Sequence, residues 1–90
     1  MEKIQFTAVL QNRVGLHARP AALFVRTAKK YQADITVEKE GNKTDAKKIL
    51  GVLGLGAEKG DSITVYLEGP DAQQAKDILK SMIEDKFGEE

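Results

Sequence analysis

Cysteine and tryptophan are both absent from this chain of 90 residues. Without cysteine, the chain has neither a disulfide framework nor a thiolate metal site. Because 14 basic and 14 acidic side chains cancel, the overall charge does not favour a nucleic-acid partner. No apolar run is long enough to span a membrane, and no signal-peptide pattern is present. We therefore expect one cytoplasmic domain over residues 1–90, ending in the polar tail Gly88-Glu89-Glu90.

Three segments alternate apolar and polar residues, a pattern typical of half-buried β-strands. A turn at Glu40-Gly41-Asn42 predicts a hairpin, because Gly and Asn accept positive φ angles. A short further strand is expected to begin at Lys43 and Thr44. The apolar strand positions are Ile4, Phe6, Ala8 and Leu10 in the first strand, Ala33, Ile35 and Val37 in the second, and Ile63, Val65 and Leu67 in the last.

Helical periodicity marks three other segments. The first helix is expected from about residue 18 to residue 30. Asp45 is expected to cap a short second helix, which Gly54 and Gly56 end. The third helix follows the turn Gly69-Pro70-Asp71. The apolar stripes are Ala21, Phe24, Val25 and Ala28; then Ala46, Ile49, Leu50 and Leu53; and finally Ala72, Ala75, Leu79, Met82 and Ile83.

The resulting order is βαββαβα, which predicts an α+β fold. One-sided alternation in the strands favours a four-stranded antiparallel sheet with one solvated face. The helices would then cover the other face, as in an open-faced β-sandwich.

Histidine occurs once, at His17 in the segment Gly15-Leu16-His17-Ala18-Arg19-Pro20-Ala21. Proline is tolerated in a first helical turn, so His17 is expected to be the N-cap or first residue of the first helix. The free N–H groups and the positive end of the helix dipole favour an anion there. The guanidinium of Arg19 adds a planar, permanently charged phosphate clamp. These features indicate a phosphohistidine site.

Other kinds of chemistry find little support in the chain. A Ser-His-Asp triad lacks the nucleophile-elbow motif. The glycines do not fit G-x-G-x-x-G, and Gly41-Asn42-Lys43-Thr44 lacks the upstream half of a P-loop. Scattered carboxylates with one histidine give no convincing metal site. We therefore expect no metal, no cofactor and no complete catalytic set of a small enzyme.

The segment around His17 resembles the active-site signature of HPr, the histidine-containing phosphocarrier family of the bacterial phosphoenolpyruvate-dependent sugar phosphotransferase system. The resemblance extends over nearly the whole chain and includes Phe6-Thr7, Ile49-Leu50-Gly51-Val52-Leu53, Gly54-Leu55-Gly56 and Lys59-Gly60-Asp61. It implies an HPr-like open-faced sandwich with three helices on one face. It also implies that His17 accepts a phosphoryl group on Nδ1 from phospho-Enzyme I and passes it to sugar-specific IIA components. The backbone N–H groups of Ala18 and Arg19 are the expected phosphate donors.

Partner binding is expected on the first two helices. Arg19, Ala22, Arg26 and Lys29 share one side of the first helix. The resemblance implies that part of the second helix is an exposed apolar patch beside the histidine, a role that falls on Ile49, Leu50 and Leu53. An apolar centre with a basic rim fits an acidic partner. Nothing in the sequence requires more than a monomer.

Lys48 departs from the resemblance, since many HPr proteins carry a regulatory serine at the start of the second helix. Lysine has no hydroxyl to phosphorylate, and it adds a positive charge to the expected docking surface. Two other functions stay open. One is a regulatory, nitrogen-type phosphocarrier that is not devoted to sugar uptake. The other is a nucleic-acid-binding βαβ domain, although Phe6, Tyr31 and Tyr66 are few and scattered for that purpose.

Overall fold

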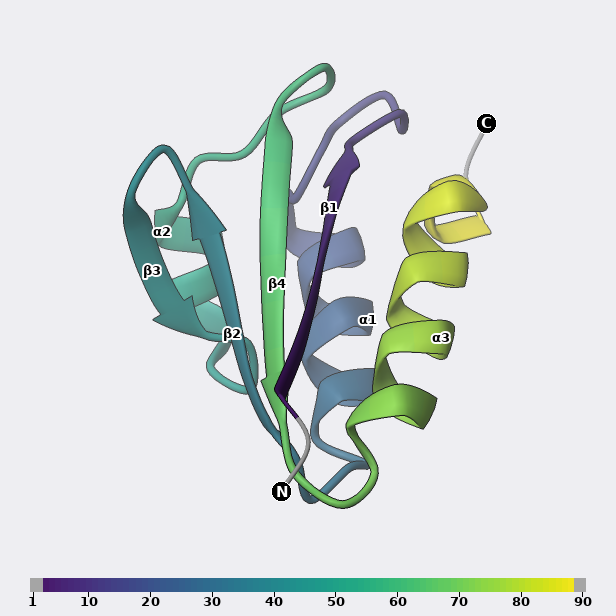
Figure 1. The fold of residues 1–90 in the computed structure, drawn as a ribbon. Coiled ribbons are helices and arrows are strands. Elements are labelled where there is room, and N and C mark those ends of the chain that lie inside the picture. Colours follow the sequence, from purple (N-terminus) through teal and green to yellow (C-terminus); the bar gives the residue numbers. More distant parts are fainter. Residues whose placement is uncertain (1–2, 89–90) are drawn as a thin grey trace.

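The computed structural model describes residues 3–88, so Glu89 and Glu90 of the expected polar tail lie outside it. Four strands form one sheet in the order β1-β4-β2-β3, and every neighbouring pair is antiparallel (Figure 1). The predicted order βαββαβα is confirmed. The elements are β1 (Lys3–Val9), α1 (Ala18–Ala28), β2 (Asp34–Lys39), β3 (Asn42–Asp45), α2 (Ile49–Gly54), β4 (Ser62–Glu68), α3 (Ala72–Glu84) and a final 3₁₀ turn, η1 (Lys86–Gly88).

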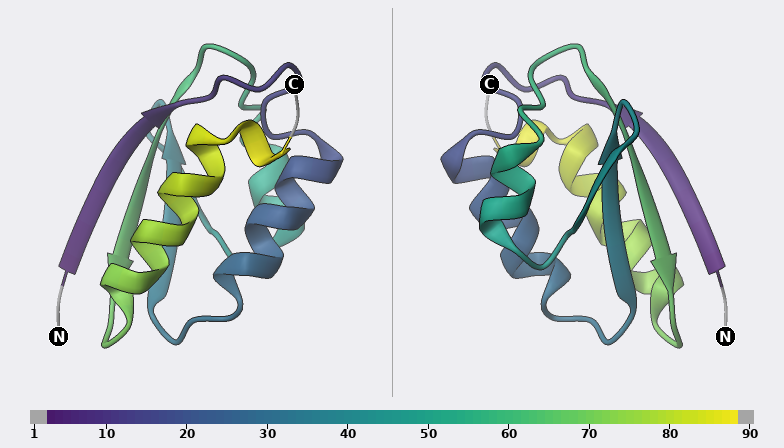
Figure 2. Two further views of the ribbon diagram at one scale, coloured as in Figure 1. Left: turned by 90° about the vertical axis from the view of Figure 1, so that its right-hand side faces the viewer. Right: turned by 90° about the vertical axis from the view of Figure 1, so that its left-hand side faces the viewer.

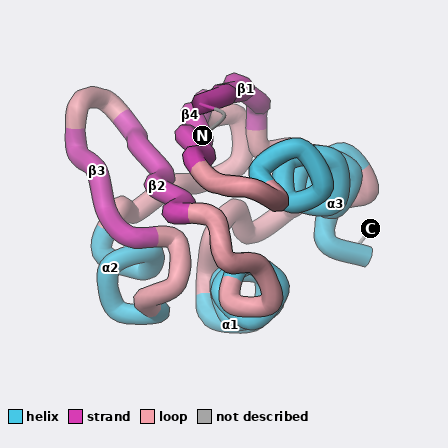
Figure 3. Tube along the Cα trace, turned by 60° about the horizontal axis from the view of Figure 1, so that its bottom comes forward, coloured by secondary structure: helices cyan, strands magenta, loops and turns pink. Residues whose placement is uncertain are grey.

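The register of the sheet aligns the apolar residues of neighbouring strands on one face. Val65 in β4 pairs with Phe6 in β1 and with Val37 in β2. All three side chains are buried, as the alternating pattern predicts. Side chains of successive strand residues point to opposite faces, so these three residues lie on the same face of the sheet. This face forms one side of the hydrophobic core. The helices cover it from one side (Figures 2 and 3).

The first helix follows its predicted stripe. Ala21, Phe24, Val25 and Ala28 are all buried. The helix ends at Ala28, slightly before the expected end, because the N–H groups of Lys30 and Tyr31 turn back to the carbonyls of Thr27 and Ala28. In α3 the predicted inner residues Ala72, Ala75, Leu79 and Ile83 are buried, and Met82 is half-buried.

The start of α2 differs from the prediction. Asp45 is the last residue of β3, paired with Thr36, and the N-cap of α2 is Lys48. The Asp45 carboxylate instead accepts a hydrogen bond from the Lys47 backbone N–H at 2.9 Å. Asp45 therefore stabilises the turn before the helix. It does not cap the helix, because its backbone is paired with Thr36 as the last residue of β3.

The apolar residues of α2 divide between core and solvent. Val52 is fully buried, although the predicted stripe did not include it. Leu50 is 81% exposed, as the HPr resemblance implied. Two residues along a helix differ by roughly 200°, so a short helix that buries Val52 turns Leu50 outward. Ile49 is at the exposed edge and Leu53 packs partly against the core.

The C-terminal turn η1 contributes a core residue that periodicity does not reveal. Lys86 and Phe87 both adopt positive φ angles, 56° and 55°. This left-handed backbone folds the chain back on itself and buries the Phe87 ring. Phe87 thus joins the core although it follows the last turn of α3.

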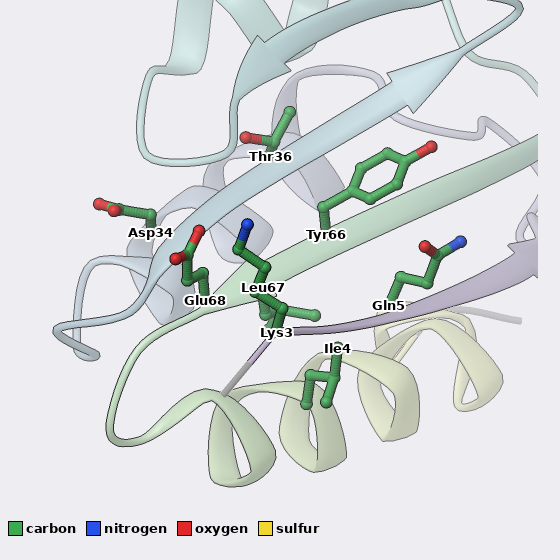
Figure 4. Close-up of a pocket in the computed structure, with 8 residues that line it drawn as sticks. All are labelled: Lys3, Ile4, Gln5, Asp34, Thr36, Tyr66, Leu67 and Glu68. Atoms are coloured by element: carbon green, nitrogen blue, oxygen red, sulfur yellow. The ribbon is translucent and has the colours of Figure 1, made fainter. Parts of the chain in front are cut away.

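The other face of the sheet is uncovered and polar. Tyr66 donates a hydrogen bond to Glu38 Oε1 at 2.5 Å, which raises the pKa of the tyrosine. The ammonium of Lys43 lies 4.8 Å from the centre of the Tyr66 ring. A shallow hollow on this face includes Lys3, Tyr66 and Glu68 (Figure 4). Of the residues that line it, Tyr66 is the one joined to a neighbouring strand by the hydrogen bond to Glu38.

Candidate phosphorylation site and docking surface

His17 is the N-cap residue of α1. Its backbone is extended, with φ −78° and ψ −171°, and its carbonyl accepts the first helical hydrogen bond from Ala21 N–H at 2.8 Å. The imidazole is exposed and forms no capping hydrogen bond with the helix. The ring is therefore exposed to solvent and is not held by the backbone of the helix that it caps.

The first turn of α1 offers two backbone donors beside the ring. The N–H groups of Ala18 and Arg19 precede the first helical hydrogen bond and have no partner within the helix. Pro20, which comes next, has no N–H at all. No acidic side chain lies in this turn to compete for the donors. The local field therefore favours an anion at the N-cap.

Arg19 adds an exposed positive charge to this end of the helix. Its side chain is exposed, and within residues 3–88 it forms no ion pair. Pro20, its neighbour, is buried and fixes the helix start against the core. The backbone of this turn is thus held in place while the guanidinium remains available to an anionic group.

The loop before His17 is anchored by residues that the sequence analysis did not identify. Leu16 is buried, and its N–H donates to the Ala57 carbonyl at 2.9 Å. The fully buried Asn12 donates from Nδ2 to the Gly15 carbonyl at 2.7 Å. Leu16 could have been recognised as an apolar residue that adjoins the histidine, but no sequence pattern singles out Ala57.

The expected docking residues of α1 lie beside α2. A shallow apolar groove between these two helices is lined by Ala22, Val25, Arg26, Lys29 and Ile49. The structure therefore brings together three of the α1 residues and one of the α2 residues named above. Figure 2 shows the two helices side by side.

Lys48, Leu50 and Leu53 do not line this groove. Lys48 and Leu50 are nevertheless exposed at the start of α2. Leu53 is half-buried and packs against the core, so it offers less surface than the other two. The basic residues Arg26 and Lys29 are exposed and take part in no ion pair among the described residues, so the groove has a positive rim.

The described part of the chain holds no group of three or more histidine, cysteine, aspartate or glutamate side chains suited to a metal ion. None of its helices has the length and apolar character needed to cross a membrane. The hollow of Figure 4 lies on the uncovered face of the sheet, and His17 is not among the residues that line it.

The chain is thus a small α+β domain with an open-faced sheet and an exposed histidine at the N-cap of its first helix. Residues 4–85 match the family model described as the PTS HPr component phosphorylation site. The chain therefore belongs to the HPr family, the phosphocarriers of the phosphotransferase system.

Individual relatives agree in sequence and in structure. The HPr-like protein Crh of Halalkalibacterium halodurans is 44% identical over 72 residues, which cover 80% of this chain and 86% of that protein. The phosphocarrier protein HPr of Cupriavidus necator is 36% identical over 86 residues, covering 96% and 97%. The crystal structure of HPr-C-His from Thermoanaerobacter tengcongensis superposes with a TM-score of 0.92 at 46% identity, covering 100% and 99%.

Some structures of relatives are dimers. One is the HPr dimer from T. tengcongensis, and another is the swapped dimer of Bacillus subtilis Crh, a catabolite-repression protein. Dimers therefore occur among the relatives, and a monomer stays a prediction for this chain.

Proposed function

We propose that this protein carries phosphoryl groups on His17, accepting them from phospho-Enzyme I and passing them to sugar-specific IIA components. The observation that carries the proposal is the exposed His17 imidazole at the N-cap of α1, beside two backbone donors without helical partners. Membership of the HPr family supports the same chemistry. The reaction would take place in the cytoplasm.

In the proposed reaction, His17 Nδ1 attacks the phosphorus atom of the donor. The new nitrogen–phosphorus bond forms as the bond between phosphorus and the donor atom breaks. The N–H groups of Ala18 and Arg19 face the phosphoryl oxygens, and the Arg19 guanidinium neutralises part of their charge. An acceptor then attacks the same phosphorus and releases the imidazole. His17 is thus a transient phosphoryl site, and the protein is a substrate of Enzyme I rather than an enzyme.

The surface formed by Ala22, Arg26, Lys29, Lys48, Ile49, Leu50 and Leu53 is the proposed partner site. Its apolar centre and positive rim fit a partner that is acidic around an apolar contact. Arg19 lies on the same side of α1 and links this surface to the histidine. Because the site and the surface are complete within one chain, we propose that the monomer is the acting form.

Incubation with Enzyme I and phosphoenolpyruvate, followed by intact mass measurement, tests the proposed function. We expect the mass to rise by one phosphoryl group that is labile in acid and stable in alkali. His17→Ala should stay unmodified, because the chain contains no other imidazole. A phosphorylated His17→Ala variant, or a wild-type protein that takes no phosphate, would contradict the proposal.

A second candidate is a regulatory HPr-like carrier that does not serve sugar uptake. It is favoured by the relatives named HPr-like protein Crh, one of which is 44% identical. Both candidates share His17, so they differ in the acceptor. Offering the phosphorylated protein to sugar-specific IIA components and to nitrogen-type acceptors distinguishes them by which acceptor gains the phosphate.

A further inference from the structure

The backbone that leads into His17 depends on a segment distant in sequence. Leu10, after β1, pairs with the segment before β4: its N–H donates to the Asp61 carbonyl at 2.9 Å, and its carbonyl accepts from Gly60 N–H at 2.8 Å. Six residues later, Leu16 N–H donates to the Ala57 carbonyl at 2.9 Å. Residues 57–61 therefore hold both ends of the loop that presents His17. The two loops lie side by side at one end of the molecule (Figures 1 and 2).

The backbones of the two loops are in close contact at Gly15. Gly15 has a φ of +60°, and a Cβ there would lie 2.5 Å from the Ala57 oxygen and 2.5 Å from the Glu58 Cα. The backbones touch directly, so a displacement of residues 57 and 58 moves Gly15 and Leu16 with them. His17 follows immediately. The position of the imidazole is thus tied to the shape of the segment 55–61.

One lysine and one aspartate hold the shape of that segment. Asp61 Oδ2 accepts from the Glu58 N–H at 2.8 Å, and the Asp61 N–H donates to the Glu58 carbonyl at 2.9 Å. Lys39, at the end of β2, donates from Nζ to the Gly56 carbonyl at 3.1 Å and lies 3.3 Å from Asp61 Oδ2. The ammonium of Lys39 therefore joins both ends of the segment, at Gly56 and at Asp61, to β2 of the sheet.

This pair is better shielded than an ordinary surface ion pair. The side chains of Lys39 and Asp61 are 18% and 33% exposed. The Glu58 backbone N–H, and after it Lys39, lower the pKa of Asp61, so the carboxylate is charged at neutral pH. Lys39 and Asp61 form the only ion pair within residues 3–88. It lies at the segment that supports the phosphorylation site rather than on a helix surface.

We propose that Lys39 and Asp61 are positioning residues for His17: they fix the segment 55–61, which in turn sets the backbone geometry from Gly15 to Ala18 at which the imidazole meets a phosphoryl donor. The inference rests on the proposed function. Both act through the Ala57–Leu16 hydrogen bond, which joins this segment to the backbone before His17.

The first test examines the unphosphorylated protein by amide hydrogen exchange and NMR. Lys39→Met keeps the aliphatic stem and removes the positive charge, and Asp61→Asn removes the negative charge of the other partner. We expect the Leu16 amide to exchange roughly tenfold faster in both variants, with shifted amide signals at His17 and Ala18. Lys39→Arg should restore the wild-type values. Lys43→Met, which removes an exposed lysine over Tyr66 on the open face, is the matched control and should change none of them.

The second test measures phosphoryl transfer from phospho-Enzyme I. We expect Lys39→Met to lower the rate at saturating donor and to leave the half-saturating concentration unchanged, because the docking surface is intact. Lys39→Arg should recover the rate. The double variant Lys39→Met, Asp61→Asn should be no slower than the slower single variant, since both changes release one segment.

Unchanged Leu16 exchange in both single variants would overturn the inference. Equal acceleration of the amides shared by β1 and β4 would also overturn it, because it would show general destabilisation. If Lys39→Met does not fold, Asp61→Asn decides the question. If the wild-type protein takes no phosphate, the proposed function fails, but the exchange measurements still establish whether the pair positions His17.

Discussion

Arg19 is the residue for which the sequence and the structure make the most direct case after His17. Its backbone N–H belongs to the proposed anion site, and its exposed guanidinium forms no ion pair within the described residues. Pro20 holds the turn against the core independently of the arginine side chain. Arg19 can therefore be changed without disturbing the helix start.

Arg19→Ala should slow phosphoryl transfer roughly tenfold, the effect of losing one charged hydrogen bond. Rates of phosphorylation by Enzyme I and of transfer to an acceptor provide the measurement, and circular dichroism should be unchanged. Lys80→Ala, which removes an exposed cation from α3, serves as the control and should transfer at the wild-type rate. Wild-type rates for Arg19→Ala with both donor and acceptor would remove Arg19 from the site.

At the residue scale, the candidate site could be proposed from the sequence, whereas the residues that hold its backbone could not. His17, Arg19 and Pro20 are adjacent in the chain, so their combination could be interpreted directly. Asn12 could not be assigned, because its hydrogen bond to Gly15 depends on a loop conformation. The pairing of Lys39 with Asp61 depends on the packing of two segments that are distant in sequence.

At the scale of the element, α2 combines a core residue with the proposed docking residue within six residues. Val52 is fully buried, and Leu50 is 81% exposed on the opposite side. Hydrophobic stabilisation comes from removing apolar surface from water. An exposed leucine therefore adds nothing to the stability of the isolated protein. The exposed Leu50 side chain is therefore the proposed apolar contact for a partner.

Leu50→Glu should leave the circular dichroism spectrum and thermal midpoint unchanged and should weaken binding to Enzyme I tenfold to a hundredfold, the equivalent of ~1.5–3 kcal/mol for a buried leucine. Titration calorimetry measures the affinity. Val52→Glu is the matched control on the same helix and should unfold the protein, because it places a charge in the core. An unfolded Leu50→Glu variant, or unchanged affinity, would show that Leu50 is not a partner contact.

Periodicity predicted the long elements and failed at the short one. The strands and α1 each repeat their pattern often enough to define a buried face. In α2 the pattern selected Leu50 and missed Val52, since both inner and outer sides of the helix are apolar. Asp45 was wrongly assigned as the cap because a capping aspartate and a strand-end aspartate look alike in sequence.

At the scale of the whole molecule, Asp71 ties the loop after α1 to the start of α3. Its two carboxylate oxygens accept from the backbone N–H groups of Gln32 and Ala33, each at 2.8 Å. Lys47 also reaches this corner, donating to the Tyr31 carbonyl at 2.8 Å. The Gln32 N–H leads the groups that lower the pKa of Asp71 below its usual value of 3.8.

A lowered pKa in the folded state means that the Asp71 carboxylate stabilises the fold above about pH 3.8 and loses this effect as the pH falls through its folded value. Asp71→Asn should therefore reduce the free energy of unfolding at pH 7, and the difference from wild type should shrink toward pH 3. Urea unfolding at both pH values measures this.

Asp77→Asn is the control for that measurement, because Asp77 lies on the same helix and accepts only a local hydrogen bond from Gln73. It should change stability less than Asp71→Asn at pH 7. Asp61, whose pKa is also lowered, leaves some acid sensitivity in both variants. Equal stability of wild type and Asp71→Asn at pH 7 would contradict the role of this tie.

The first turn of α1 has one further consequence, which follows from Pro20. Proline removes the next N–H, so a phosphoryl group on His17 would find only the N–H groups of Ala18 and Arg19 along the backbone. Two backbone donors give a covalently attached phosphoryl group only modest stabilisation, so the backbone would add little bias of its own to either exchange. In the proposed relay, the direction of flow would be set by the ratio of charged donors to empty acceptors. The carrier would then report the energy supply of the cell, since the phosphorylated fraction rises when donors are plentiful and falls when acceptors are consuming.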